Sequence, residues 1–132
     1  MNRRNLLKKA LAAPAAAMPL AAQEQYAKKT RGLPPLRITD VKVVTTSAGR
    51  SYQWVFVKVI TSEPGLYGLG SASNVNMAWS VAAAIEKHFG PFWVGRDPDR
   101  IEDLWQSTNV RGYWRNSTIH NNALSGLDMA LW

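Results

Sequence analysis

Residues 52–61 read YQWVFVKVIT, and the chain continues through SEPG at 62–65 to LYGLGSA at 66–72. The first stretch is aromatic and β-branched throughout, which predicts a strand. Its valines alternate onto one face and its large side chains onto the other, so we expect a central strand with both faces covered. The two faces consist of Val55, Val57 and Val59 on one side and Trp54, Phe56, Lys58 and Ile60 on the other.

The sequences on either side of this stretch predict two further strands. The Pro-Gly pair at 64–65 is favoured at the centre of a type II turn. Residues 66–72 then return as a strand, in which Gly68 and Gly70 indicate close approach of another backbone. Residues 37–46 are rich in β-branched side chains and precede a turn. Together these patterns predict an antiparallel three-stranded meander.

After residue 73 the apolar residues follow helical spacing. Val81, Ala82, Ile85 and Phe89 fall on one stripe, which predicts a helix. The Gly-Pro pair at 90–91 is expected to end this helix.

Two further helices are expected after the first. Asp97 is a suitable N-cap with Pro98 at the first helical position, and Ser117 or Thr118 is suited to cap the next helix. The apolar pattern of this last helix continues to Trp132 without a capping glycine, so we expect a truncated chain. The predicted fold class is therefore α+β, a three-stranded antiparallel meander followed by a helical bundle.

Composition restricts the classes of function. The chain has 132 residues, no cysteine and a formal net charge of +7. Residues 1–31 carry seven Lys or Arg and one Glu, whereas residues 32–132 carry nine Lys or Arg and eight Asp or Glu. The predicted folded part is thus almost neutral, which argues against a nucleic-acid surface. The lack of cysteine excludes disulfides and thiolate chemistry.

The basic N-terminal segment has the pattern of an export signal. Arg3 and Arg4 stand before a 13-residue apolar run at 10–22, which is too short to span a bilayer. The pair resembles a twin-arginine signal, so we expect residues 1–22 to direct export to the periplasm, with membrane contact only during transport. Residues 23–36 then form a flexible linker, and residues 37–132 form the folded domain.

Four strings carry a family resemblance: GLYGLG at 65–70, VGRDPDRIEDLWQ at 94–106, YWR at 113–115 and SGLDMALW at 125–132. Together they resemble the N-terminal capping domain of the enolase superfamily, in its mandelate racemase and muconate lactonizing enzyme type, and especially its mannonate and gluconate dehydratase branch. The resemblance implies a domain that covers a C-terminal (β/α)₇β barrel, which would lie beyond residue 132.

The resemblance also implies a chemistry. Such enzymes hold a carboxylate substrate on Mg²⁺, remove the α-proton and expel a β-hydroxyl, while the cap excludes water. The expected parent is a homo-oligomeric dehydratase of sugar acids such as aldonates, with its Mg²⁺ ligands in its own barrel. The capping domain alone would then be inactive and bind no metal. A racemase or cycloisomerase of the same superfamily, or a non-catalytic periplasmic binding or assembly module, are the alternatives.

The resemblance points to one substrate loop. The loop at 70–76 corresponds to a family loop in which an asparagine reaches the substrate, and here Val75 stands at that position between Asn74 and Asn76. Ser71 replaces an acidic residue of the family pattern. Either asparagine is a candidate to bind a sugar-acid hydroxyl, and the alternative is an ordinary turn or helix-capping role.

A second candidate segment is aromatic and basic. Tyr113, Trp114 and Arg115 form the family string YWR, and together with the nearby Arg111 they are expected at an interface or in a substrate loop. His120 is expected to be a surface or capping residue with no acid–base role. The carboxylates at 97–103 are expected to favour a helix start and not to bind metal.

Overall fold

The computed structural model of the chain describes residues 25, 34–47, 49, 53–113 and 115–132. Residues 35–132 form one compact unit, and most of residues 1–34 lies outside the described residues. The predicted signal at residues 1–22, with Arg3 and Arg4, lies wholly outside them.

The compact unit begins with the predicted meander. Strands β1 (Ile38–Ser47), β2 (Gln53–Thr61) and β3 (Tyr67–Ser71) form an antiparallel sheet in the order β1-β2-β3. The turn between β2 and β3 contains Gly65 with a φ of 83°, a conformation that suits glycine. The predicted strand order and the central place of β2 are confirmed.

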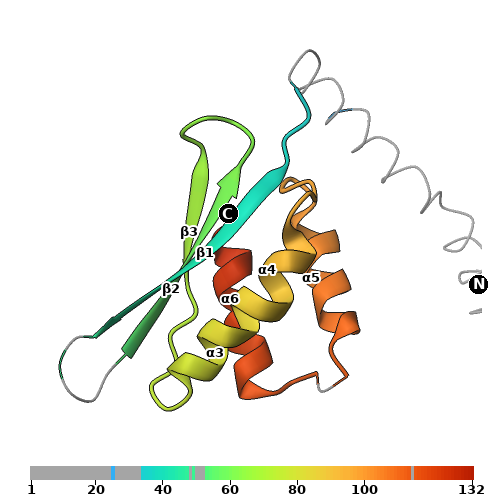
Figure 1. Cartoon of the computed structure of the whole chain (residues 1–132). Helices are drawn as coiled ribbons and strands as arrows, with labels where there is room; N and C mark the ends of the chain where they lie inside the picture. The colour runs from blue at the N-terminus through green and yellow to red at the C-terminus, as the bar shows by residue number, and fades with distance from the viewer. Residues whose placement is uncertain (1–24, 26–33, 48, 50–52, 114) are drawn as a thin grey trace, which may run out of the picture. The chain divides into compact units, whose positions relative to one another are not determined.

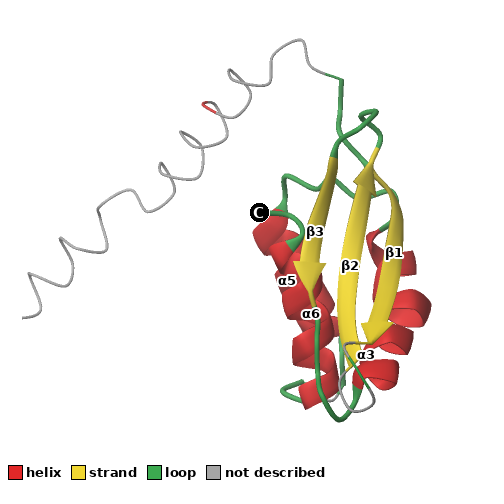
Figure 2. Ribbon diagram, turned by 90° about the vertical axis from the view of Figure 1, so that its left-hand side faces the viewer, coloured by secondary structure: helices red, strands yellow, loops and turns green. Residues whose placement is uncertain are grey.

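The helices follow the sheet in the chain and cover one of its faces (Figures 1 and 2). They are α3 (Ala78–Ala84), the π-helix η1 (Ile85–Phe89), α4 (Gly90–Trp93), α5 (Ile101–Arg111) and α6 (Thr118–Met129). In the part of the chain that the structure describes, no helix has the length and apolar character needed to cross a membrane.

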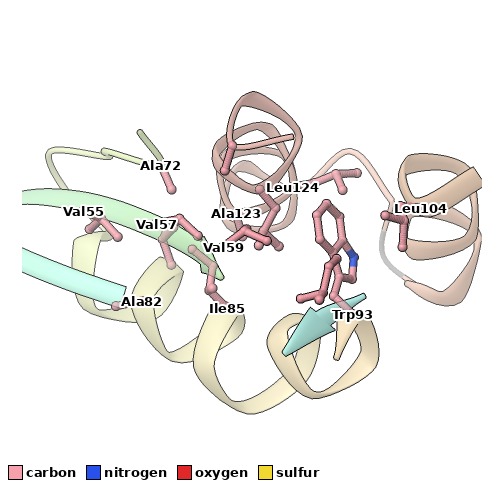
Figure 3. Packing of buried hydrophobic residues seen from close by; sticks show 14 of the residues in the cluster. Val55, Val57, Val59, Ala72, Ala82, Ile85, Trp93, Leu104, Ala123 and Leu124 are labelled. Carbon is pink, nitrogen blue, oxygen red and sulfur yellow. The ribbon is translucent and has the colours of Figure 1, made fainter. Parts of the chain in front are cut away.

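The core lies between the sheet and this helical layer. The three β2 valines are almost completely buried, as the alternation predicts, and Figure 3 shows them directed toward side chains of α3, η1 and α6. At one end of the core, buried Trp93 donates its indole N–H to Thr108 Oγ1 at 2.8 Å, and this bond joins α4 to α5. The hydroxyl of Thr108 in turn donates to the carbonyl of Leu104 at 2.6 Å, so the polar atoms of these two buried side chains are paired.

The close backbone approach predicted for β3 is confirmed. A methyl group on Gly68 or Gly70 would collide with the carbonyl oxygen of Ala130 or Gly126, respectively. Conversely, a Cβ on Gly126 would lie 2.6 Å from the Cβ of Ala72. Glycine on both sides therefore lets α6 lie directly against β3, and this contact positions the end of the strand.

Two predicted helix boundaries are wrong. The first helix does not end at residues 90–91, because Pro91 stands at the start of α4, where a missing N–H is tolerated. The turn comes instead at Gly95, whose φ is 86°. Asp97 accepts a hydrogen bond from the Asp99 N–H at 3.0 Å and so stabilises a turn, while α5 begins later, at Ile101.

The last helix and the outer sheet face also differ from expectation. Ser117 caps α6 as predicted, since its Oγ accepts the His120 N–H at 3.1 Å. The helix does not run to Trp132 but ends at Met129, and a turn follows. The outer face of β2 is not covered by helices α3 to α6, which pack on the other face (Figure 2), and Trp54 and Phe56 are exposed.

Candidate functional site

A polar loop at one end of the sheet is the candidate site. Strand β3 ends there, and the starts of β2, α3 and α6 lie at the same end (Figure 1). The loop at 72–77 is anchored on β2, because the Ala72 N–H donates to the Val55 carbonyl at 2.8 Å. The Ser73 hydroxyl accepts the Val55 N–H at 3.1 Å and lies 3.1 Å from the Ser71 hydroxyl. These bonds tie the loop to the central strand.

Within this loop the two candidate asparagines differ. Asn74 Oδ1 accepts the N–H groups of Asn76 at 3.2 Å and Met77 at 3.1 Å, so it closes an Asx turn that leads into α3. Its side-chain oxygen thus has the turn role that the sequence also allowed. Asn76 is exposed. The family asparagine position, Val75, is exposed as well, with 59% of its surface accessible.

Two open hollows flank the loop. One, of about 390 Å³, lies between the loop and the start of α6, and the other, of about 360 Å³, lies beside the start of β2. The lining of the first hollow is mainly apolar, but it includes amide and hydroxyl groups that can donate and accept hydrogen bonds to a polyol chain. The first hollow is lined by Asn74, Asn76, Met77, Ser117, Thr118 and Ile119.

The aromatic and basic segment divides in the structure. The guanidinium carbon of Arg111 lies 4.5 Å from the ring centroid of Phe92, so this side chain stacks on α4 and is not among the residues of either hollow. Tyr113 is 88% exposed and Arg115 is exposed, whereas the Trp114 side chain lies outside the described residues.

Two residues that follow this segment in the chain, Ser117 and Thr118, lie beside the 72–77 loop instead. Ser117 and Thr118 line the first hollow, although their sequence pattern indicated only helix capping. No sequence signal distinguishes a hydroxyl that caps a helix from one that also lines a hollow. Their position depends on the packing of α6 against β3, which is a tertiary contact.

His120 is buried, which contradicts the surface position expected for it. Its ring meets the ring of Phe89 edge to face, with centroids 5.1 Å apart, and Nε2 has no hydrogen-bond partner. Gly112 makes room for the imidazole, since a Cβ there would lie 2.5 Å from the His120 Cε1. Desolvation by burial lowers the pKa of His120 from its ordinary value of 6.5.

The described residues do not fit a magnesium site. No group of three or more His, Cys, Asp or Glu among them lies close enough to hold a metal ion. Within the acidic segment near α5, Asp97 is engaged in its turn and Asp103 pairs with Arg100 at 3.4 Å. The described residues therefore provide no set of side chains that could ligate a metal ion.

A three-stranded antiparallel meander with a helical layer on one face, and a polar loop at one end, defines an enolase-type capping domain. The family model described as "Mandelate racemase / muconate lactonizing enzyme, N-terminal domain" matches residues 27–132. The chain belongs to this family. The expected fold class is confirmed.

Curated relatives and solved structures agree with this assignment. A D-galactonate dehydratase family member of Musicola paradisiaca is 55% identical over 97 residues, which cover 74% of this chain and 23% of the relative. An enolase of Pantoea ananatis, solved with bound D-gluconate and Mg, is 54% identical with a TM-score of 0.70, and the match covers 74% of this chain and 23% of that one.

More distant structures share the same domain. An enolase superfamily member from Salmonella Typhimurium is 27% identical with a TM-score of 0.66, over 74% of this chain and 25% of that one. The chain spans about a quarter of the length of the relatives that it matches. Membership of the enolase superfamily and similarity to its dehydratase family members are thus confirmed.

Proposed function

We propose that residues 35–132 act as the substrate-covering cap of a magnesium-dependent dehydratase of sugar acids, of the gluconate or mannonate type. The observation that carries the proposal is the hollow between the 72–77 loop and the start of α6, whose lining includes amide and hydroxyl groups. It occurs in a domain 54% identical to the matching part of an enolase that holds D-gluconate and Mg.

In this proposal the cap binds and shields the polyol chain. The bonds from Val55 hold the loop in place, so its polar groups are positioned before a substrate arrives. Asn76, Ser117 and Thr118 then provide hydrogen bonds to substrate hydroxyls, and the loop excludes water from the reacting carbon. The metal and the groups that move the α-proton would belong to a barrel domain.

A domain exchange tests this function. Residues 36–132 should replace the matching segment of the Pantoea ananatis enolase, and the chimera should be assayed on D-gluconate and other aldonates with Mg²⁺. We expect a 2-keto-3-deoxy product, formed by a protein that also retains the oligomeric state of the parent. A folded, Mg²⁺-binding chimera without dehydration would contradict the proposal.

Point variants of the chimera test the loop. Asn76→Ala should lower kcat/KM about fivefold, because one hydrogen bond to a substrate is worth on the order of 1 kcal/mol. Asn121→Ala is the matched control, since Asn121 is exposed on α6 and belongs to neither hollow. Equal kinetics for the two variants would remove Asn76 from the site. Exchange of the α-proton without loss of hydroxyl would favour a racemase.

The chain by itself should be inactive. With Mg²⁺ and a panel of aldonates, the purified 132-residue chain is expected to form no 2-keto-3-deoxy acid, because its described residues offer no metal cluster. Product formation that EDTA abolishes would refute this expectation. Specific binding of a ligand by a folded but inactive chain would favour a binding module.

The proposal includes a location and an assembly. The arginine pair at positions 3 and 4 supports export through the twin-arginine route, which carries proteins already folded. The enzyme would then act in the periplasm as a homo-oligomer.

A further inference from the structure

His120 is a titratable side chain that other elements of the fold enclose. Only 8% of the residue is exposed, and its Nε2 has no hydrogen-bond partner in the described part of the chain. On one side the ring meets Phe89, the last residue of η1, edge to face. On another side Gly112, which follows α5, lies so close that a methyl group there would overlap the imidazole. The ring therefore fits its place only as a neutral, closely packed group.

A proton on this ring would have no compensating charge nearby. None of the ion pairs among the described residues includes His120. Burial is what lowers its pKa, because a charged imidazole loses hydration there. The ring also lies in the first turn of α6, where the positive end of the helix dipole opposes a further positive charge.

The charged and titratable groups of the surrounding elements lie elsewhere. The three on η1 are exposed, and Arg111 stacks on Phe92. The two carboxylates of α5 are in its first turn, at the end opposite Gly112, and the two groups that follow α5 are exposed. Helix α3, which also packs on α6, carries no charged residue. The full set is Glu86, Lys87 and His88 on η1, Glu102, Asp103 and Arg111 on α5, Tyr113 and Arg115 after it, and Asp128 in the last turn of α6.

The turn that carries His120 also lines the first hollow. We call residues 117–120 the cap turn. Within it, Ser117 Oγ accepts the His120 N–H at 3.1 Å, and the Ser117 carbonyl accepts the Asn121 N–H at 2.9 Å. Ser117 and Thr118 contribute the hydroxyl groups of the hollow. Because a helical side chain has few χ1 rotamers, the His120 ring reaches water through movement of this turn and not by rotation alone.

We propose that protonation of His120 opens the cap turn and takes Ser117 and Thr118 out of the hollow, so that the domain responds to acid at its candidate site. The closed turn binds the neutral ring, and the open turn exposes a ring of ordinary pKa, 6.5. The closed turn is therefore favoured above pH 6.5, and the open turn gains as the pH falls below it. The inference holds whatever ligand the hollow binds, so its failure is separate from a failure of the proposed function.

An NMR titration of the full chain from pH 7.5 to pH 5.5 tests the proposal. The amide signals of the cap turn should shift with the same midpoint as the His120 Cε1 signal, and this midpoint should lie below 6.5. The amides of Val57 and Leu104, which belong to the core, should keep their shifts. Protection of the His120 and Asn121 amides from hydrogen exchange, corrected for the intrinsic effect of pH, should fall by up to about tenfold, the limit for one proton.

The two histidines of the chain supply matched variants. His120→Gln removes the titrating group and should abolish the acid response, whereas His88→Gln, a change at the exposed histidine of η1, should leave it intact. Circular dichroism checks that both variants fold. Gly112→Ala provides a second perturbation, because its methyl group should displace the ring and give, at pH 7.5, the cap-turn shifts that the parent chain shows at pH 5.5.

Three results would overturn the proposal. One is a cap turn whose signals stay unchanged over this pH range, whether or not the His120 ring titrates. Another is an acid response that His120→Gln retains. The third is the simultaneous loss of all native signals, since acid would then unfold the whole domain and not open one turn.

Discussion

Replacing Gly70 by alanine should push α6 away from β3 and destabilise the domain. The added methyl would collide with the carbonyl oxygen of Gly126, and a backbone atom cannot rotate out of its way. Overpacking of this kind costs about 1–3 kcal/mol, and contact with backbone places Gly70→Ala near 3 kcal/mol. For a domain of this size the melting temperature should fall by about 10–20 °C.

The assay is thermal unfolding followed by circular dichroism, with Gly65→Ala as the matched control. Gly65 has open space around its Cβ position and a φ of 83°, so alanine there meets only backbone strain of about 1 kcal/mol. Amide shifts should change in α6 and in the 72–77 loop for Gly70→Ala but not for Gly65→Ala. If Gly70→Ala costs no more stability than Gly65→Ala, the close contact between β3 and α6 is not what holds the loop.

Three further predictions concern the loop, the buried histidine and export. Asn74→Ala should lower the free energy of unfolding by about 1 kcal/mol, because the N–H groups of Asn76 and Met77 lose their acceptor; unchanged urea denaturation would contradict the turn role. Burial lowers the pKa of His120 in the folded chain, so the unfolded chain binds the proton more readily and the free energy of unfolding should fall as the pH drops through about 6.5. His120→Leu should flatten this dependence of stability on pH in thermal melts between pH 5 and 8. An unaltered slope would assign the pH dependence to other groups. Changing both arginines at positions 3 and 4 to lysine should abolish periplasmic delivery of a fused reporter, and undiminished delivery would point to the general secretory route instead.

The hydrophobic pattern of the sequence determined the sheet. The β2 valines alternate with polar and aromatic neighbours, and a period of two assigns them to one face whatever packs upon it. The turn residues and the paired glycines of β3 are similarly local signals, because each reports a backbone conformation or a missing side chain. The family strings are also local, and they are sufficient by themselves to indicate a capping domain.

Helix boundaries depended on competition that the sequence alone does not resolve. Pro91 is compatible with both the end and the first turn of a helix, and Asp97 with both a helix N-cap and a turn. Each residue therefore fits more than one helix boundary. Packing of Trp93 and Leu104 in the core decided that α4 continues past the proline and that α5 begins later. Tertiary burial outweighed capping preferences of about 1 kcal/mol.

The candidate site was only partly readable from sequence for the same reason. The sequence placed two asparagines in one loop but could not assign their roles, because an asparagine that closes a turn and an asparagine that binds a ligand are the same residue type. Only the tertiary structure brought Ser117 and Thr118 to that loop, buried His120 beside Gly112 and left Trp54 and Phe56 exposed. Each of these outcomes depends on which face of an element another element covers, and that choice arises from contacts between residues far apart in the chain.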